Sequence, residues 1–90
     1  MVKSVRLKIS GRVHHVGFRY FATEEAGKYK IKGFVKNEPD GVVLVEAEAD
    51  ETDLDLFILS LKKGPGWARV DHLDLQTIPF AGYKDFGVSY

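Results

Sequence analysis

The chain contains no cysteine. This absence excludes a disulfide framework, a thiolate metal site and a cysteine nucleophile. No apolar run approaches the roughly 20 residues that span a bilayer, so we expect no membrane association. Thirteen basic side chains against thirteen acidic ones leave no net charge, whereas a general nucleic-acid binder normally carries a basic excess. We therefore expect a cytoplasmic protein that binds neither membranes nor nucleic acid.

What the chain does contain is enough apolar material for one folded core. Its 90 residues include 44% hydrophobic side chains, a share that argues against disorder. A chain of this length forms one domain, which we expect to span residues 1–90. No repeat, linker or low-complexity segment divides it.

Hydrophobic periodicity predicts the secondary structure. Helical spacing of apolar residues indicates two helices, over residues 18–29 and 50–63, the second with Asp50 as its N-cap. Pro39-Asp40-Gly41 is typical of a turn and makes an antiparallel hairpin of the strands around it. Apolar and polar residues alternate along five segments, as in strands with one buried face: residues 5–10, 31–36, 43–49, 72–77 and 86–90.

The order of these elements is β-α-β-β-α-β with a short extra C-terminal strand, which predicts an α+β fold. Two helices can cover one face of a four-stranded antiparallel sheet, and right-handed crossovers then lead to the split-βαβ, ferredoxin-like sandwich. We expect Glu46 and Glu48 to form a solvated strand face and Glu25 to lie off the buried stripe of its helix. Because many unrelated functions use this fold, function has to be argued from a site.

The most unusual segment joins the first strand to the first helix and reads Gly11-Arg12-Val13-His14-His15-Val16-Gly17-Phe18-Arg19. Backbone N–H groups can converge there beside a helix N-terminus, where unpaired donors and the helix dipole attract anions. Arg19 adds a planar positive fork suited to phosphate oxygens. The glycines lack the spacing of a Walker A loop and no Lys-Ser or Lys-Thr follows, which disfavours nucleotide binding of that kind.

This segment resembles the acylphosphatase signature, glycine-x-valine-glutamine-glycine-valine-x-phenylalanine-arginine. A second stretch similar to the family reads Gly33-Phe34-Val35-Lys36-Asn37-Glu38-Pro39-Asp40-Gly41-Val42-Val43. Lys63-Gly64-Pro65 and Ala68-Arg69-Val70 also follow the family's order and spacing. The similarity extends over nearly the whole chain, and the length and the order of elements agree with it.

The resemblance implies an acylphosphatase, an enzyme that hydrolyses the carboxyl–phosphate bond of small acyl phosphates without a metal or other cofactor. It implies that Arg19 holds the phosphoryl group together with the backbone amides of the loop, and that Asn37 positions the attacking water. The loop residues expected to bind substrate beside Arg19 are His14, His15, Val16, Gly17 and Phe18. Inorganic phosphate is then a product, and we expect the protein to be a monomer.

The sequence departs from the signature at two neighbouring positions. His14 stands in place of the family's glutamine, and His15 replaces the glycine that follows it. If the loop requires a positive φ at position 15, a histidine there costs roughly 1–2 kcal/mol of backbone strain. Ala49 is a third departure, where the family usually has glycine, and it concerns packing at a strand end.

Other functions are compatible with parts of the pattern. RNA-recognition domains share the β-α-β-β-α-β order, but residues 42–48 contain no aromatic side chain for base stacking. A non-catalytic, ferredoxin-like module that binds acyl phosphates or other anions is the main alternative. Taken singly, Arg19 is also compatible with an exposed helix start and Asn37 with turn initiation. His14 and His15 have no evident third partner for a metal site.

Overall fold

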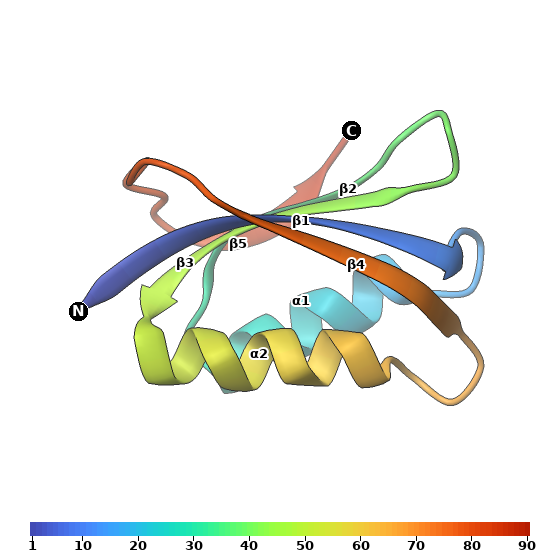
Figure 1. Ribbon diagram of the computed structural model, residues 1–90, viewed down its shortest axis with the longest axis horizontal. Coiled ribbons are helices and arrows are strands. Elements are labelled where there is room, and N and C mark those ends of the chain that lie inside the picture. The colour runs from blue at the N-terminus through green and yellow to red at the C-terminus, as the bar shows by residue number, and fades with distance from the viewer.

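Seven elements of secondary structure form the protein, and the computed structural model describes all residues from 1 to 90. Two helices cover one face of a five-stranded sheet (Figure 1). The elements in chain order are β1 (Val2–Arg12), α1 (Phe18–Lys28), β2 (Lys32–Asn37), β3 (Val43–Asp50), α2 (Glu51–Lys63), β4 (Arg69–Thr77) and β5 (Phe86–Ser89). Neither helix is long and apolar enough to cross a membrane.

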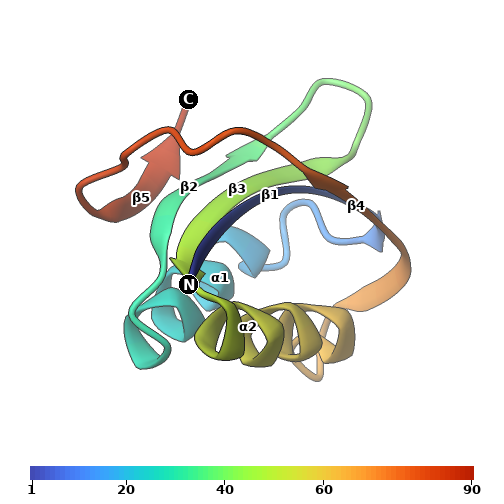
Figure 2. The same cartoon turned by 60° about the vertical axis from the view of Figure 1, so that its left-hand side comes forward.

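The sheet has the strand order β4-β1-β3-β2-β5. The first four strands are antiparallel to their neighbours, and β5 pairs in parallel with β2 at the edge. The predicted α+β, ferredoxin-like fold with a short extra C-terminal strand is therefore confirmed. The chain reaches this edge because residues 78–85 pass over the face of the sheet that the helices leave uncovered (Figure 2).

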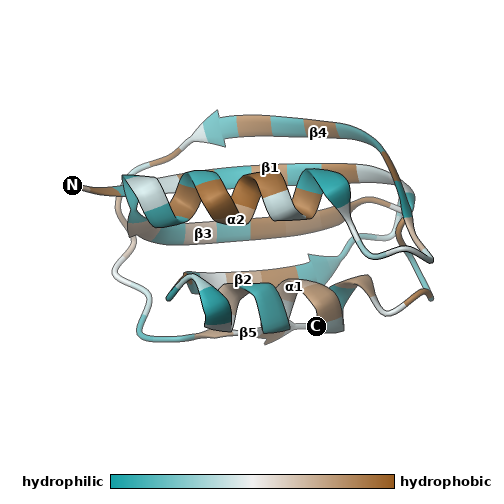
Figure 3. Cartoon of the chain, turned by 90° about the horizontal axis from the view of Figure 1, so that it is seen from below, coloured by the Kyte–Doolittle hydropathy of each residue, from teal (hydrophilic) through white to brown (hydrophobic).

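Both helices lie on the opposite face, α2 over β1 and β3 and α1 over β2 and β5 (Figure 3). Alternate residues of the strands point toward them, and this alternation is the pattern that predicted the strands. From α2, Leu54, Phe57, Ile58 and Leu61 complete the core. Burial of these apolar side chains stabilises the fold, at about 25 cal/mol for each Å² of apolar surface removed from water.

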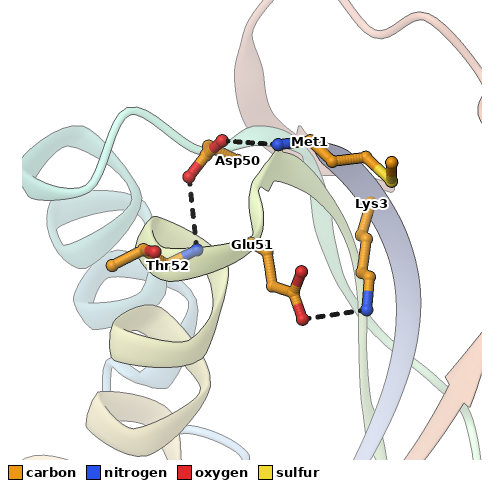
Figure 4. A network of polar contacts seen from close by, with 5 residues as sticks. All are labelled: Met1, Lys3, Asp50, Glu51 and Thr52. Carbon is orange, nitrogen blue, oxygen red and sulfur yellow. Dashed lines mark hydrogen bonds and ion pairs between the residues drawn. The ribbon is translucent and has the colours of Figure 1, made fainter.

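The start of α2 is held by polar contacts at the corner where β3 ends (Figure 4). The Asp50 side chain accepts a hydrogen bond of 3.3 Å from the Thr52 backbone N–H. This bond confirms the prediction that Asp50 is the N-cap of the helix. The terminal ammonium of Met1 lies 3.0 Å from the same carboxylate, and these two donors hold the pKa of Asp50 below its ordinary value. Lys3 pairs with Glu51 at 2.9 Å.

Two carboxylates are buried, although we expected Glu25 to lie off the buried stripe of its helix and Glu48 to be solvated. Glu25 is bonded by the Lys28 ammonium, at 2.8 Å, and by the Ser60 hydroxyl, and both contacts lower its pKa. Glu48 is only 3% exposed, because residues 78–85 cover the strand face on which it lies. Both expectations were wrong. The periodicity of α1 does not reveal that Ser60 of α2 lies against Glu25, and alternation along β3 does not reveal which distant segment covers Glu48.

Glu46 lies beside Glu48 and is also drawn into this covered region. It accepts a hydrogen bond from the Tyr83 hydroxyl and pairs with Arg6 at 2.8 Å. Burial and the bond to Glu46 raise the pKa of Tyr83 to about 12. The outer face of the sheet is therefore a polar network that attaches residues 78–85 to β1 and β3.

Candidate active site

A bulge near the end of β1 precedes the β1–α1 loop, which begins after Arg12. The register between β1 and β4 shifts between Ser10 and Gly11. A Cβ atom on Gly11 would lie 2.2 Å from the Arg69 carbonyl oxygen, so only glycine permits this close approach of two backbones. Beyond the bulge, Gly11 and Arg12 still pair with Val70 and Arg69 of β4 in the shifted register. The chain leaves the sheet toward α1 after Arg12.

Two residues of this loop have left-handed backbone conformations. Gly17, the N-cap of α1, has a φ of 77°, and His15 has a φ of 59°. The condition for strain at position 15 is thus met, because a non-glycine residue in this region costs roughly 1–2 kcal/mol. Such strain persists where the surrounding structure imposes it, often at functional sites.

The loop presents unused hydrogen-bond donors. No backbone N–H of residues 13–17 donates to another backbone group, and no side chain caps the N-terminus of α1. The first turn of α1 contains no acidic residue, so no carboxylate of the helix itself competes for these donors. Free N–H groups and the positive end of the helix dipole together favour an anion at this place.

Arg19 is the second residue of α1 and is half-buried. It forms no salt bridge with any carboxylate of the chain. Its guanidinium carbon lies 5.7 Å from the centre of the Tyr90 ring, within cation–π distance. The Thr23 hydroxyl donates a 2.8 Å hydrogen bond to the Arg19 carbonyl oxygen, one helical turn away.

Asn37 is the last residue of β2 and is paired with Val43 across the hairpin. Its side-chain oxygen Oδ1 is buried and has no hydrogen-bond partner in the chain. An unpaired buried acceptor costs about 1–3 kcal/mol, so native structures rarely retain one without a reason. The group is available to a water molecule or a ligand.

Arg19 and Asn37 line the same hollow, which has a volume of about 340 Å³. Figure 1 shows the loop and the β2–β3 turn at the same end of the sheet. No carboxylate side chain lines the hollow, and nowhere in the chain do three His, Asp or Glu side chains gather in the arrangement of a metal site. The lining residues are Val13, His15, Gly17, Phe18, Arg19, Tyr20, Thr23, Asn37, Val88 and Tyr90.

The structure thus brings together most of the residues expected from the sequence: His15, Gly17, Phe18, Arg19 and Asn37. Val16 instead packs against the hydrophobic core. The His14 ring turns toward the hairpin, where its Nε2–H donates to the Val42 carbonyl oxygen at 3.1 Å. The backbones of both residues remain part of the loop.

Several lining residues were missed in the sequence. Tyr20 and Thr23 lie one helical turn apart beside Arg19, so the periodicity of α1 contained a signal for them. Val88 and Tyr90 come from the end of the chain and reach the hollow because β5 pairs with β2. No local pattern indicates that pairing.

Known proteins resemble this chain over its full length. The family model for acylphosphatase matches residues 5–88. The acylphosphatase of Pediococcus pentosaceus is 42% identical over 90 residues, which cover 99% of this chain and 100% of the relative. That of Archaeoglobus fulgidus is 39% identical over 87 residues, 97% of this chain and 98% of the relative. The crystal structure of acylphosphatase from Bacillus subtilis superposes with a TM-score of 0.95 at 36% identity, covering 100% of both chains.

Proposed function

The chain belongs to the acylphosphatase family and hydrolyses acyl phosphates, and we propose that Arg19, Asn37 and the β1–α1 loop perform this reaction without a metal ion. One observation carries the proposal: two polar groups without partners line one hollow. Arg19 has no carboxylate partner and the buried Asn37 oxygen has no donor. The first group suits a phosphate oxygen and the second a water molecule.

The phosphoryl group of the substrate binds at the N-terminus of α1. The Arg19 guanidinium donates to two of its oxygens, a geometry that the planar fork favours. The backbone N–H groups of residues 14–18, none of which donates to another backbone group, bind the remaining oxygen. This arrangement includes His14, His15, Val16, Gly17 and Phe18 as substrate-binding residues through their main chain, and requires no particular side chain at 14 or 16.

Asn37 positions the water that attacks phosphorus. Its Oδ1 accepts a hydrogen bond from this water. The bond orients the water so that a lone pair of the water oxygen points at the phosphorus atom, on the side opposite the acyl oxygen. The new bond from water to phosphorus forms as the bond from phosphorus to the acyl oxygen breaks, and the surplus proton of the water passes to solvent. The products are a carboxylate and inorganic phosphate.

This small set of groups is sufficient because of the leaving group. The conjugate acid of a carboxylate has a pKa of about 4, so the acyl oxygen departs without protonation. Catalysis of phosphoryl transfer then depends on orientation and on stabilising charge at the phosphoryl oxygens. Arg19 and the loop amides supply the charge, and Asn37 supplies the orientation.

Hydrolysis of acetyl phosphate in H₂¹⁸O with excess EDTA tests this mechanism. Attack at phosphorus places the label in inorganic phosphate, with turnover unchanged by EDTA. Label in the acetate would show attack at the acyl carbon, and activity restored only by added metal would contradict the metal-free reaction. Arg69→Ala serves as a matched control for Arg19→Ala, because Arg69 is an exposed arginine paired with Asp71 at 2.9 Å.

We also propose that the enzyme acts as a monomer in the cytoplasm. The mechanism above uses only Arg19, Asn37 and the β1–α1 loop, which one copy of the chain brings to the same hollow. Sedimentation equilibrium measures the oligomeric state directly. A dimer whose specific activity falls as it dissociates on dilution would contradict a monomeric enzyme.

A further inference from the structure

We propose that His15 adds a second, pH-dependent positive charge to the anion site, so that the enzyme binds its phosphoryl ligand more tightly as the solution becomes acidic. The inference rests on the proposed function, in that the hollow beside Arg19 holds the phosphoryl group. It concerns a side chain of this sequence and not the backbone of the loop.

The position of His15 makes its side chain part of the site. It lines the hollow with Arg19 and Asn37, whereas its neighbour His14 is turned away and bonded to the Val42 carbonyl oxygen at 3.1 Å. The two rings lie edge to face, 5.9 Å apart. Only one of the two adjacent imidazoles therefore lines the anion site.

The backbone of His15 carries a cost that glycine would avoid. Its φ of 59° lies in the left-handed region, and His15 is exposed and takes no part in the hydrophobic core. An imidazole that lines the hollow is the feature that distinguishes histidine from glycine here. A strained residue at a binding site is a reason to ask what its side chain contributes.

The charge balance of the hollow makes the imidazole effective. Arg19 is the one permanent cation among its lining residues. Protonation of His15 would add a second charge next to a bound dianion. No carboxylate side chain lines the hollow, and no carboxylate, the terminal one included, forms a salt bridge with Arg19 or His15. An imidazole ordinarily changes charge between about pH 5 and 8, so the effect falls within the range in which the enzyme can be assayed.

A change in the charge of another group near His15 could also make binding depend on pH, so each of these groups has to be considered. The hollow contributes Arg19, Tyr20 and Tyr90, the last also bearing the terminal carboxylate. The neighbouring loop residues are Arg12 and His14. The β2–β3 turn, at the same end of the sheet (Figure 1), contains Glu38 and Asp40. Arginines and carboxylates remain charged and phenols remain neutral between about pH 5.5 and 8. His14 is therefore the one other group whose ionisation has to be tested.

The measurement is the dissociation constant of sulfate, obtained by NMR titration at about pH 5.5 and 8. Sulfate keeps two negative charges over this range, unlike inorganic phosphate, and its binding is read without turnover. We expect the parent to bind sulfate about fivefold more tightly at the lower pH, as expected for a partly exposed charge pair. A parent whose affinity does not change with pH, or that binds no sulfate, overturns the proposal.

Substitutions assign the effect to one ring. His15→Asn tolerates a positive φ but cannot ionise, so its affinity should equal the parent's weaker value at both pH values. His15→Lys keeps a permanent charge and should bind tightly at both. His72→Asn is the control and should retain the parent's pH dependence, because His72 is an exposed residue of β4. His14 belongs to the binding loop, so His14→Asn is judged only by the ratio of its two dissociation constants; this ratio should equal the parent's, because the His14 ring is directed to the Val42 carbonyl oxygen. Persistence of the dependence in His15→Asn, or its loss in His14→Asn, contradicts the proposal.

The two proposals fail in different ways. In the first case, sulfate affinity depends on pH and on His15 as expected, but substitution of Arg19 and Asn37 does not reduce acyl phosphate hydrolysis. The catalytic mechanism is then wrong and the role of His15 stands. If hydrolysis depends on Arg19 and Asn37 while sulfate affinity is independent of pH, the mechanism stands and the role of His15 is wrong.

Discussion

The Ser4 hydroxyl donates a 2.8 Å hydrogen bond to the Glu48 carboxylate, and the two residues face each other directly across the β1–β3 pair. The same carboxylate accepts hydrogen bonds from the backbone N–H groups of Ala81, Gly82 and Tyr83. Glu48 is thus the point at which the segment before β5 is attached to the sheet. That segment leads to Val88 and Tyr90, which line the active-site hollow.

Glu48→Gln should destabilise the protein and reduce its sensitivity to acid. Burial acts to raise the pKa of Glu48, but the bonds from Ala81, Ser4, Tyr83 and Gly82 lower it below the ordinary value. A lowered folded-state pKa stabilises the protein above the ordinary pKa of the carboxyl, and this stability is lost as the pH falls through the folded value. The loss at neutral pH should be about 1–3 kcal/mol, because buried N–H donors lose an acceptor.

Urea denaturation between about pH 3 and 7 measures this difference. Glu51→Gln is the matched control, since Glu51 makes an exposed ion pair with Lys3 that contributes ~1 kcal/mol or less. Equal free energies of unfolding for Glu48→Gln and Glu51→Gln at neutral pH would show that the Glu48 contacts add no net stability.

Alanine at two glycines should have opposite effects on stability. A Cβ on Gly33 would lie 1.8 Å from the Glu46 carbonyl oxygen, and its φ is 141°, so Gly33→Ala should prevent normal pairing of β2 with β3. Gly27 lies in α1 with no atom within 4 Å of the position of a Cβ, and Gly27→Ala should stabilise by about 0.4–1 kcal/mol. Thermal denaturation of the two variants measures both effects. A Gly33→Ala variant that folds with the parent's stability would contradict the backbone geometry at that position.

Arg19→Ala should lower kcat/KM for acetyl phosphate by at least about 10²–10³-fold, because it removes the permanent charge of the site. Arg19→Lys should recover only part of the loss, since an ammonium cannot donate to two phosphate oxygens as a planar fork does. Steady-state kinetics of Arg19→Ala and Arg69→Ala show whether the loss is specific to Arg19 or follows the removal of any positive charge. A lysine variant as active as the parent would show that the fork geometry is not required.

The local hydrophobic pattern of the sequence predicts the strands and helices, but it predicts their ends less well. The alternation of Val5, Leu7 and Ile9 predicts the centre of β1, but the strand extends to Arg12, because backbone pairing with β4 continues past the alternating residues. Asp50 is found as an N-cap because capping depends on neighbours in sequence. Local chemistry determines these features, so a single sequence reveals them.

Features that depend on distant segments were predicted only through family resemblance or not at all. Spacing alone does not show that Arg19 and Asn37 share a hollow; the family motifs imply it, and the fold places both there. The burial of Glu48 and the contact of Tyr90 with Arg19 both depend on the path of residues 78–85 across the sheet. That path joins two strands at opposite edges, and no periodicity in residues 78–85 indicates it.

The most direct test of the account is to compare turnover, phosphate binding and stability in Asn37→Ala. If Asn37 orients the attacking water, kcat should fall by about 10²-fold or more, while inhibition by inorganic phosphate changes little because Arg19 and the loop remain. The melting temperature should stay equal or rise, since the substitution removes a buried acceptor that has no partner. A variant that keeps the parent's kcat, or that loses activity only by unfolding, would contradict the central claim that Asn37 acts on the water.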